Sequence, residues 1–259
     1  MSRYRAMFDR LAARGEGAFG AFAMLGDPDP AASAAMLDAL VEAGADMIEV
    51  GIPFSDPVAD GPAIQAAAVR ALAAGTRTAD AFGLLAGFRR RHPGVPVGIL
   101  TYANIVVARG RRAFYRAASE AGVDSVLVAD VPLLESAPFL DSAREAGVAP
   151  VLIAAPNAPA ATLRGIASAS MGYVYCVARA GVTGADEEVR LPKKLIEDLR
   201  SLGSAPPVLG FGISRPQHVR LAIEAGAAGA ISGSAIVERI GRGEDVRPFV
   251  AAMKAATLA

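Results

Sequence analysis

Three carboxylates lie close together in the segment that begins with Glu49. Glu49 belongs to an expected strand over residues 47–50, whereas Asp56 and Asp60 follow in a loop that prolines hold open. Side chains alternate along a strand, so Glu49 shares a face with Met47. A carboxylate on an apolar strand must be paired, protonated or used in chemistry, because burying an unpaired charge is costly. This segment therefore predicts either a structural ion pair or an acid–base group at Glu49.

The other side chains that commonly do chemistry fall outside the expected strand ends. The lysines lie in helical or loop stretches, so a Schiff-base mechanism has no candidate nucleophile. The two histidines flank helices and the single cysteine faces the helices, so we expect no metal site and no serine–histidine pair. These residues are Lys193, Lys194, Lys254, His92, His218 and Cys176. The sequence predicts cofactor-free acid–base chemistry by Glu49, Asp60 and a tyrosine.

Short apolar stretches alternate with helical patterns along the whole chain. The expected strands are residues 19–25, 47–50, 96–102, 124–129, 150–154, 173–177, 207–211 and 229–232. They are apolar on both faces and separated by helices, which is typical of a parallel sheet. The expected helices are residues 3–13, 31–43, 63–74, 78–91, 111–121, 135–146, 160–169, 192–202, 217–225 and the remainder after strand eight. This pattern predicts an α/β fold, a (β/α)8 TIM barrel with an extra N-terminal helix, as one domain over residues 1–259; a doubly wound sheet is the alternative.

The composition argues against a nucleic-acid-binding, secreted or membrane-spanning protein. Lys and Arg together number 26 and Asp and Glu together number 26, so no basic excess indicates nucleic acid or an anionic membrane as a partner. The N-terminus lacks the apolar core of a signal peptide, and no apolar run reaches the ~18 residues of a membrane span. One cysteine cannot form an internal disulfide, which fits a reducing compartment. We therefore expect a soluble, cytoplasmic protein.

A barrel of this kind has its active site at the carboxyl ends of its strands. Glu49 lies at such an end and points inward, which favours a functional role over a structural ion pair. The other inward positions are apolar or aromatic, and they are Phe22, Leu100, Tyr102, Leu127, Ala129, Ile153, Tyr173 and Tyr175. Such residues usually fill the barrel, but at its mouth they predict an apolar cavity for a flat hydrophobic part of a substrate.

Three glycine-bearing segments late in the chain predict a phosphate site. They follow the last three expected strands and are Gly181–Gly184, Gly210–Ser214 and Ser232–Ile236. In barrels, the loops after strands seven and eight frequently bind phosphate together with a short helix N-terminus. Glycine lets backbone N–H groups approach the anion, although a tight turn is the usual reason for a single glycine. The last two segments contain no lysine or arginine, so backbone donors, the Ser234 hydroxyl and the helix dipole would hold the anion.

Seven segments together resemble the α subunit of tryptophan synthase over essentially the whole chain. They are Leu25–Pro28, Glu49–Pro62, Tyr102–Asn104, Asp130–Pro132, Gly181–Gly184, Gly210–Ser214 and Ile231–Ile236. The resemblance implies a retro-aldol cleavage of indole-3-glycerol phosphate to indole and glyceraldehyde 3-phosphate. It also implies a β subunit in an α2β2 complex, in which β uses pyridoxal phosphate and joins indole to serine. This chain itself would hold no cofactor.

The resemblance also assigns roles to residues. Glu49 would be the general acid–base, and Asp60 would be the partner of the indole N–H. The phosphate would be bound by Gly184, Gly212, Gly233 and Ser234. From the residues themselves, we expect Tyr175 either to hydrogen-bond Glu49 or only to fill the barrel, and we expect Thr183 to orient Asp60 when the loop closes. Substrate contacts are expected from Phe22, Leu100, Tyr102, Leu127, Ala129, Ile153, Thr183 and Phe211. Ala178 and Met24 depart from the usual serine and threonine of the family.

The barrel mouth is the expected docking surface for the β subunit. Its expected contacts lie in loops after strand ends and are Pro53, Phe54, Asp56, Pro57, Asn104 and Pro132. The resemblance implies that the segment of residues 53–60 and the segment around Thr183 move on closure. The length of the loop of residues 179–190 also predicts mobility. Two alternatives remain: another phosphate-binding barrel, such as an isomerase, and a non-catalytic subunit that only activates β. The presence of both Glu49 and Asp60 argues against the second alternative.

Overall fold

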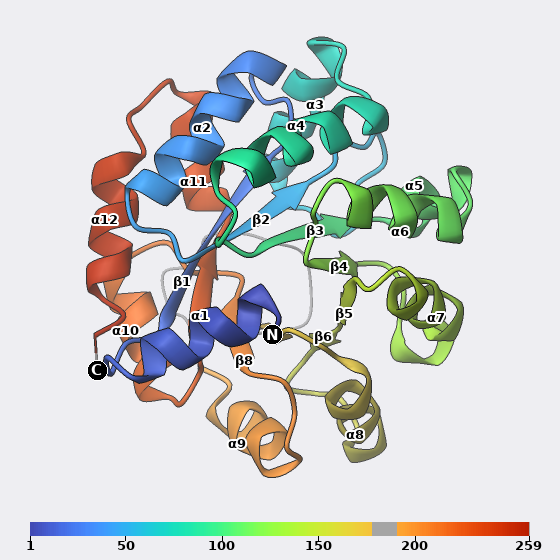
Figure 1. The fold of residues 1–259 in the computed structure, drawn as a ribbon. Helices are drawn as coiled ribbons and strands as arrows, with labels where there is room; N and C mark the ends of the chain where they lie inside the picture. Colours follow the sequence, from blue (N-terminus) through green and yellow to red (C-terminus); the bar gives the residue numbers. More distant parts are fainter. Residues whose placement is uncertain (178–190, 259) are drawn as a thin grey trace.

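The computed structural model describes residues 1–177 and 191–258, and its parallel sheet is ringed by helices (Figure 1). The strands are β1 Ala18–Met24, β2 Met47–Gly51, β3 Val97–Thr101, β4 Ser125–Val128, β5 Ala149–Val151, β6 Ile153–Ala154, β7 Val174–Val177, β8 Pro207–Gly210 and β9 Gly229–Ser232. Their order in the sheet is β5-β4-β3-β2-β1-β9-β8-β7-β6, and the ladders are parallel. The predicted TIM barrel is therefore confirmed.

The fifth expected strand is interrupted at Leu152, so the sequence prediction of one strand over 150–154 is corrected to β5 and β6. β5 pairs with β4 at one end of the strand order, and β6 pairs with β7 at the other end. The segment of residues 149–154 therefore connects the two ends of the sheet. The Leu152 carbonyl accepts a hydrogen bond from the Tyr175 N–H at 3.1 Å. The chain thereby closes the barrel, and eight β/α units remain the right description of the architecture.

Helices cover the outer face of the sheet (Figure 1). They are α1 Arg3–Ala12, α2 Pro30–Glu42, α3 Pro62–Ala73, α4 Thr78–Arg91, α5 Ala103–Ala108, α6 Arg111–Glu120, α7 Ala137–Glu145, α8 Ala160–Ala169, α9 Lys193–Ser201, α10 Pro216–Glu224, α11 Ser234–Gly241 and α12 Arg247–Ala255, with a 3-10 turn η1 at Leu133–Glu135. The sequence did not predict α5 and η1, because each is too short to show a helical period. Both follow strand ends and add surface at the barrel mouth.

The buried side chains form one cluster inside the barrel and one between the sheet and the helices. The predicted N-terminal helix α1 lies across the amino end of the barrel (Figure 1), and Tyr4, Met7 and Leu11 join the inner cluster. The Tyr4 hydroxyl is 2.8 Å from Ser125 Oγ. Cys176 lies in the outer cluster, as its alternation predicted. Because α1 closes the amino end, the carboxyl ends of the strands are the open side of the barrel.

Some expectations cannot be placed on this fold. The loop of residues 179–190, together with Thr183, Gly184 and the departure at Ala178, lies outside the described residues. Among the helices that are described, none is both long enough and apolar enough to cross a lipid bilayer.

Candidate active site

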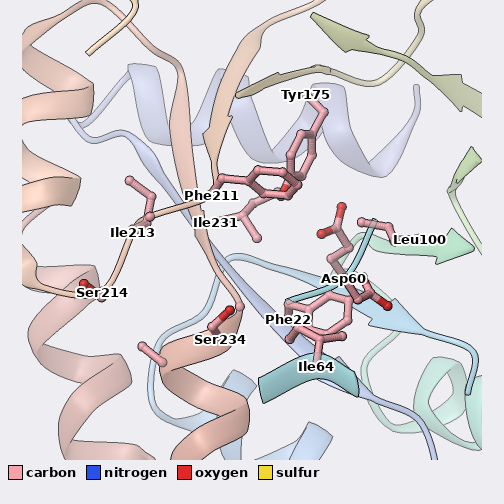
Figure 2. Close-up of a pocket in the computed structure, with 14 residues that line it drawn as sticks. Phe22, Asp60, Ile64, Leu100, Tyr175, Phe211, Ile213, Ser214, Ile231 and Ser234 are labelled. Atoms are coloured by element: carbon pink, nitrogen blue, oxygen red, sulfur yellow. The ribbon is translucent and has the colours of Figure 1, made fainter. Parts of the chain in front are cut away.

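An open cavity lies at the carboxyl ends of the strands (Figure 2). Its lining combines two carboxylates, apolar side chains and glycine-bearing turns: Phe22, Glu49, Asp60, Ile64, Leu100, Tyr175, Phe211, Gly212, Ile213, Ser214, Ile231, Gly233, Ser234 and Ala235. Figure 2 shows Asp60 on one side of the cavity and Ser214 and Ser234 on the other. This lining suits a small ligand with an apolar body and one charged end.

Glu49 projects into the cavity from β2, between Phe22 on β1 and Gly98 on β3 in the sheet register. Its side chain is buried, and Oε1 accepts a hydrogen bond from the Tyr173 hydroxyl at 2.8 Å. Oε2 has no hydrogen-bond partner among the described residues. Burial raises the pKa of Glu49 to about 7, and the Tyr173 hydroxyl opposes this shift. A carboxyl group with this pKa can both donate and accept a proton near neutral pH.

The expected hydrogen bond from Tyr175 to Glu49 is wrong, because Tyr173 makes it instead. Both tyrosines face inward, but they stand at different heights in the barrel. Tyr173 packs against Tyr4 near the closed end, with ring centroids 5.3 Å apart, whereas Tyr175 packs against Phe211 at 5.8 Å. Alternation predicts the face of a strand and not the height, which depends on the stagger of strands around the barrel. Tyr175 remains part of the cavity wall.

The Tyr173 assignment can be tested by replacing its hydroxyl. We expect Tyr173→Phe to raise the pKa of Glu49 above that of the native protein, because the lost donor stabilises the carboxylate. The ring contact with Tyr4 is retained. A ¹³C NMR titration of the Glu49 carboxyl group measures the effect. Tyr175→Phe is the matched control and should leave this pKa unchanged; a larger shift for Tyr175→Phe would return the role to Tyr175.

Asp60 lies just before α3, and its buried carboxylate reaches the cavity. Gln65 Nε2 donates to the Asp60 carbonyl at 2.7 Å and so joins this residue to the first turn of α3. The Tyr102 hydroxyl hydrogen-bonds the Asp60 carboxylate and accepts from the Ala59 N–H at 3.3 Å. Burial raises the pKa of Asp60 to about 6, while the bond from Tyr102 lowers it. Asp60 is thus held beside the apolar wall and is ionised above this pH.

The glycine-bearing turns of β8 and β9 form the other side of the cavity. Gly233 is the residue before α11, so the first N–H groups of that helix lack intrahelical acceptors and its dipole favours an anion there. Gly212 has φ +74°, a conformation that glycine adopts without strain. Phe211 has φ +65° and is the non-glycine residue with positive φ in the described chain. The phosphate site that the sequence predicts falls on these turns and on Ser234.

The predicted substrate residues divide into three groups. Phe22, Leu100 and Phe211 line the cavity. Tyr102 contacts Asp60, and Leu127 is buried in the inner cluster. Ala129 and Ile153 line a second hollow, which Asp130 and Pro132 also border.

Sequence reasoning missed several cavity residues: Ile64, Ile213, Ser214, Ile231 and Ala235, together with Tyr173 as the partner of Glu49. Ile213, Ser214 and Ala235 adjoin the predicted glycines, and Ile231 is on an expected strand. The sequence positions of these four residues could therefore have predicted that they line the cavity. Ile64 faces the cavity from α3, and helical spacing alone does not show which apolar residue of a helix reaches a site.

The predicted docking residues lie around the mouth in different environments. Pro53 is buried, Phe54 and Pro57 are half-buried, and Asp56, Asn104 and Pro132 are exposed. The Phe54 ring packs against the Tyr102 ring with centroids 5.5 Å apart. The apolar side chains that are exposed near the mouth are Val58, Val107 and Leu134.

Known proteins resemble this chain over its full length. The family model described as tryptophan synthase alpha chain matches residues 8–257. The chain is 53% identical to the tryptophan synthase alpha chain of Serratia proteamaculans (strain 568), with 100% of each covered, and 54% identical to that of Cronobacter sakazakii (strain ATCC BAA-894), with 100% and 99% covered. A solved chain from Aquifex aeolicus VF5 superposes with TM-score 0.93 at 32% identity, covering 100% of both chains. A structure of Mycobacterium tuberculosis tryptophan synthase gives TM-score 0.92 at 30% identity, covering 100% of this chain and 99% of the other.

Proposed function

Since this chain belongs to the tryptophan synthase alpha chain family and is a lyase of tryptophan synthesis, we propose that Glu49, Asp60 and the glycine turns form its catalytic site. The reaction is the retro-aldol cleavage of indole-3-glycerol phosphate to indole and glyceraldehyde 3-phosphate. One observation carries the residue assignment: a buried carboxyl group with a pKa of about 7 shares an apolar cavity with two glycine turns suited to phosphate.

The cleavage needs two proton transfers. Protonation of indole C3 gives a cation that is delocalised onto the ring nitrogen. Removal of the side-chain hydroxyl proton then lets the bond between C3 and the glycerol chain break, and its electron pair neutralises the ring cation. The products are indole and an aldehyde. Glu49 is the protein group that delivers the first proton and, as a carboxylate, takes the second.

Asp60 and the apolar wall act on the ring. Ionised Asp60 accepts the ring N–H and stabilises the positive charge that grows there, an effect that is strong where water is excluded. Phe22, Leu100 and Phe211 provide apolar surface for the flat indole. No step in this scheme requires a cofactor held by this chain; pyridoxal phosphate belongs to the chemistry of the β partner.

The decisive assay measures indole release from indole-3-glycerol phosphate by the purified chain alone and with a β subunit. Release by the chain alone, increased by β, is the expected result. Release that occurs only with β present, and survives Glu49→Gln, would favour a non-catalytic activating subunit. Turnover of a sugar phosphate without any indole release would favour an isomerase.

Ser234→Asp tests the phosphate end of the site. The new carboxylate would stand in the first turn of α11, where it suits the helix dipole but repels a bound phosphate. We expect the KM for indole-3-glycerol phosphate to rise about tenfold or more, the equivalent of ~1.4 kcal/mol, with little change in the affinity for indole. Ser234→Ala is the control, which removes the hydroxyl without adding charge and should have the smaller effect. Equal weakening of both ligands would contradict a phosphate site here.

The β subunit is the proposed partner at the barrel mouth, in an α2β2 complex. The exposed side chains of Val58, Val107 and Leu134 are 71%, 48% and 89% accessible and offer apolar contacts next to the predicted docking loops. The loop before α3 also reaches the site, because Phe54 packs on Tyr102 and Tyr102 bonds Asp60. Docking on this loop can therefore bias the position of a catalytic carboxylate.

Asp56→Ala tests this coupling. Asp56 is exposed on the docking loop, so its removal should leave the fold and the activity of the isolated chain largely intact. We expect the ratio of indole release with and without β to fall at sub-saturating β. Asp9→Ala removes an exposed carboxylate from α1 at the opposite end of the barrel and should leave the ratio unchanged. If Asp56→Ala also leaves it unchanged, this loop does not carry the signal.

A further inference from the structure

The turn that follows β8 has an unfavourable backbone conformation. Phe211 and Gly212 are consecutive residues with positive φ, at +65° and +74°. A non-glycine residue in this region is strained and persists only where its surroundings hold it. Gly212, Ile213 and Ser214 all line the cavity, so the groups that hold this turn also determine the shape of the cavity wall.

One tether comes from His218 on α10, which lies outside the cavity. His218 Nδ1 is 2.9 Å from the Gly212 carbonyl oxygen, and the imidazole is buried. A carbonyl can only accept a hydrogen bond, so this contact requires the proton on Nδ1. The Ser214 N–H also points at this nitrogen, from 3.3 Å, so a second polar group of the turn faces the ring rather than the cavity. Burial and the nearby Arg215 charge lower the pKa of His218, in keeping with a neutral ring that carries one proton.

A second tether comes from the neighbouring strand. Ser232 is the last residue of β9 and is fully buried, and its hydroxyl donates to the Ile213 carbonyl at 2.6 Å. Two successive peptide groups of the turn are thus fixed by two side chains from different elements. The C=O and N–H of a trans peptide point in opposite directions. Since the Gly212 carbonyl faces His218 behind the turn, the Ile213 N–H faces the cavity.

We propose that His218 and Ser232 are positioning residues, which hold the turn of Phe211–Ser214 so that the backbone N–H of Ile213 is aimed at the substrate phosphate. This inference rests on the proposed function, because it takes the cavity to bind a phosphate ester. Neither side chain lines the cavity, so neither needs to touch the substrate. His218 and Ser232 therefore influence the affinity for the phosphate group of the substrate and do not change proton transfer by Glu49.

The experiment compares His218→Leu with His218→Asn. Leucine fills the space of the ring without a donor, whereas the asparagine amide can place an N–H near the position of Nδ1. For His218→Leu we expect glycerol 3-phosphate to bind about tenfold more weakly and the KM for indole-3-glycerol phosphate to rise similarly, as for one lost hydrogen bond to a well-placed group. The kcat and the affinity for indole should stay near the native values. His218→Asn should recover most of the loss, which a purely structural role of the ring would not predict.

Two further variants keep the test decisive. Ser232→Ala removes one hydroxyl with little change in volume and should produce the same split between KM and kcat, even if His218→Leu does not fold. His92→Leu is the matched control: this other histidine caps α4 and pairs with Asp38 at 2.7 Å, away from the turn, and should not alter glycerol 3-phosphate binding.

The binding results distinguish failure of the proposed function from failure of this inference. If the native protein binds no glycerol 3-phosphate, the proposed function fails and this inference fails with it. If the native protein binds it, the inference alone is overturned by folded His218→Leu or Ser232→Ala proteins that bind it equally well. It is also overturned if His218→Asn is as impaired as His218→Leu, or if indole affinity falls in parallel.

Discussion

Glu49→Gln is expected to lower kcat by about 10²–10⁴-fold with little change in substrate affinity. The amide has the shape of the carboxyl group, and its oxygen can still accept the hydrogen bond from Tyr173. It cannot transfer a proton, so both proton transfers of the cleavage lose their protein group. Single-turnover measurements of indole release, with substrate binding measured separately, give the two quantities. A variant that keeps more than half of the native kcat would remove Glu49 from the mechanism.

The same variant has a thermodynamic signature that reports on folding. Burial raises the pKa of Glu49 from 4.5 to about 7, so its stabilising contribution is complete below pH 4.5 and is lost as the pH rises through 7. Glutamine does not titrate. As the pH rises from 4.5 to about 7, the native protein should therefore lose stability relative to Glu49→Gln. We expect the difference between their free energies of unfolding to change by roughly 3 kcal/mol at most. A loss of activity with this gain in stability excludes misfolding as the cause.

Asp60→Asn is expected to lower kcat by about 10²–10³-fold, the range typical of a lost electrostatic partner of the transition state. Asparagine keeps the shape and can still bond Tyr102, but the negative charge that faces the ring cation is gone. The native enzyme should lose activity as the pH falls below about 6, where Asp60 becomes protonated. The residual activity of Asp60→Asn should lack this acid limb.

Tyr102→Phe provides the matched control for the charge at Asp60. It removes the hydrogen bond that lowers the pKa of Asp60, so the acid limb of the pH–rate profile should move to higher pH while activity at alkaline pH persists. Full activity of Asp60→Asn across the pH range would mean that Asp60 only shapes the loop before α3.

Much of the site could be predicted from local sequence because its positions follow from local periodicity. Alternation in the strand around Glu49 predicts an inward carboxylate, and the strand end places it at the barrel mouth. The glycines of the last two turns mark where the backbone must approach a ligand, and Gly212 has the positive φ that such a turn needs. A repeated β/α pattern is likewise a local signal, so it predicts the barrel that brings these distant segments together.

Only the tertiary structure decided which side chains act on those positions. Tyr173 rather than Tyr175 bonds Glu49 across 124 residues of sequence, because strand stagger sets the heights that alternation leaves open. Tyr102 bonds Asp60, and His218 reaches back from α10 to the Gly212 carbonyl. The pKa values of the two carboxyl groups are also tertiary properties, because their largest cause is burial by elements from the whole chain. Local sequence sets the types and faces of the catalytic groups, whereas packing sets their partners and their protonation.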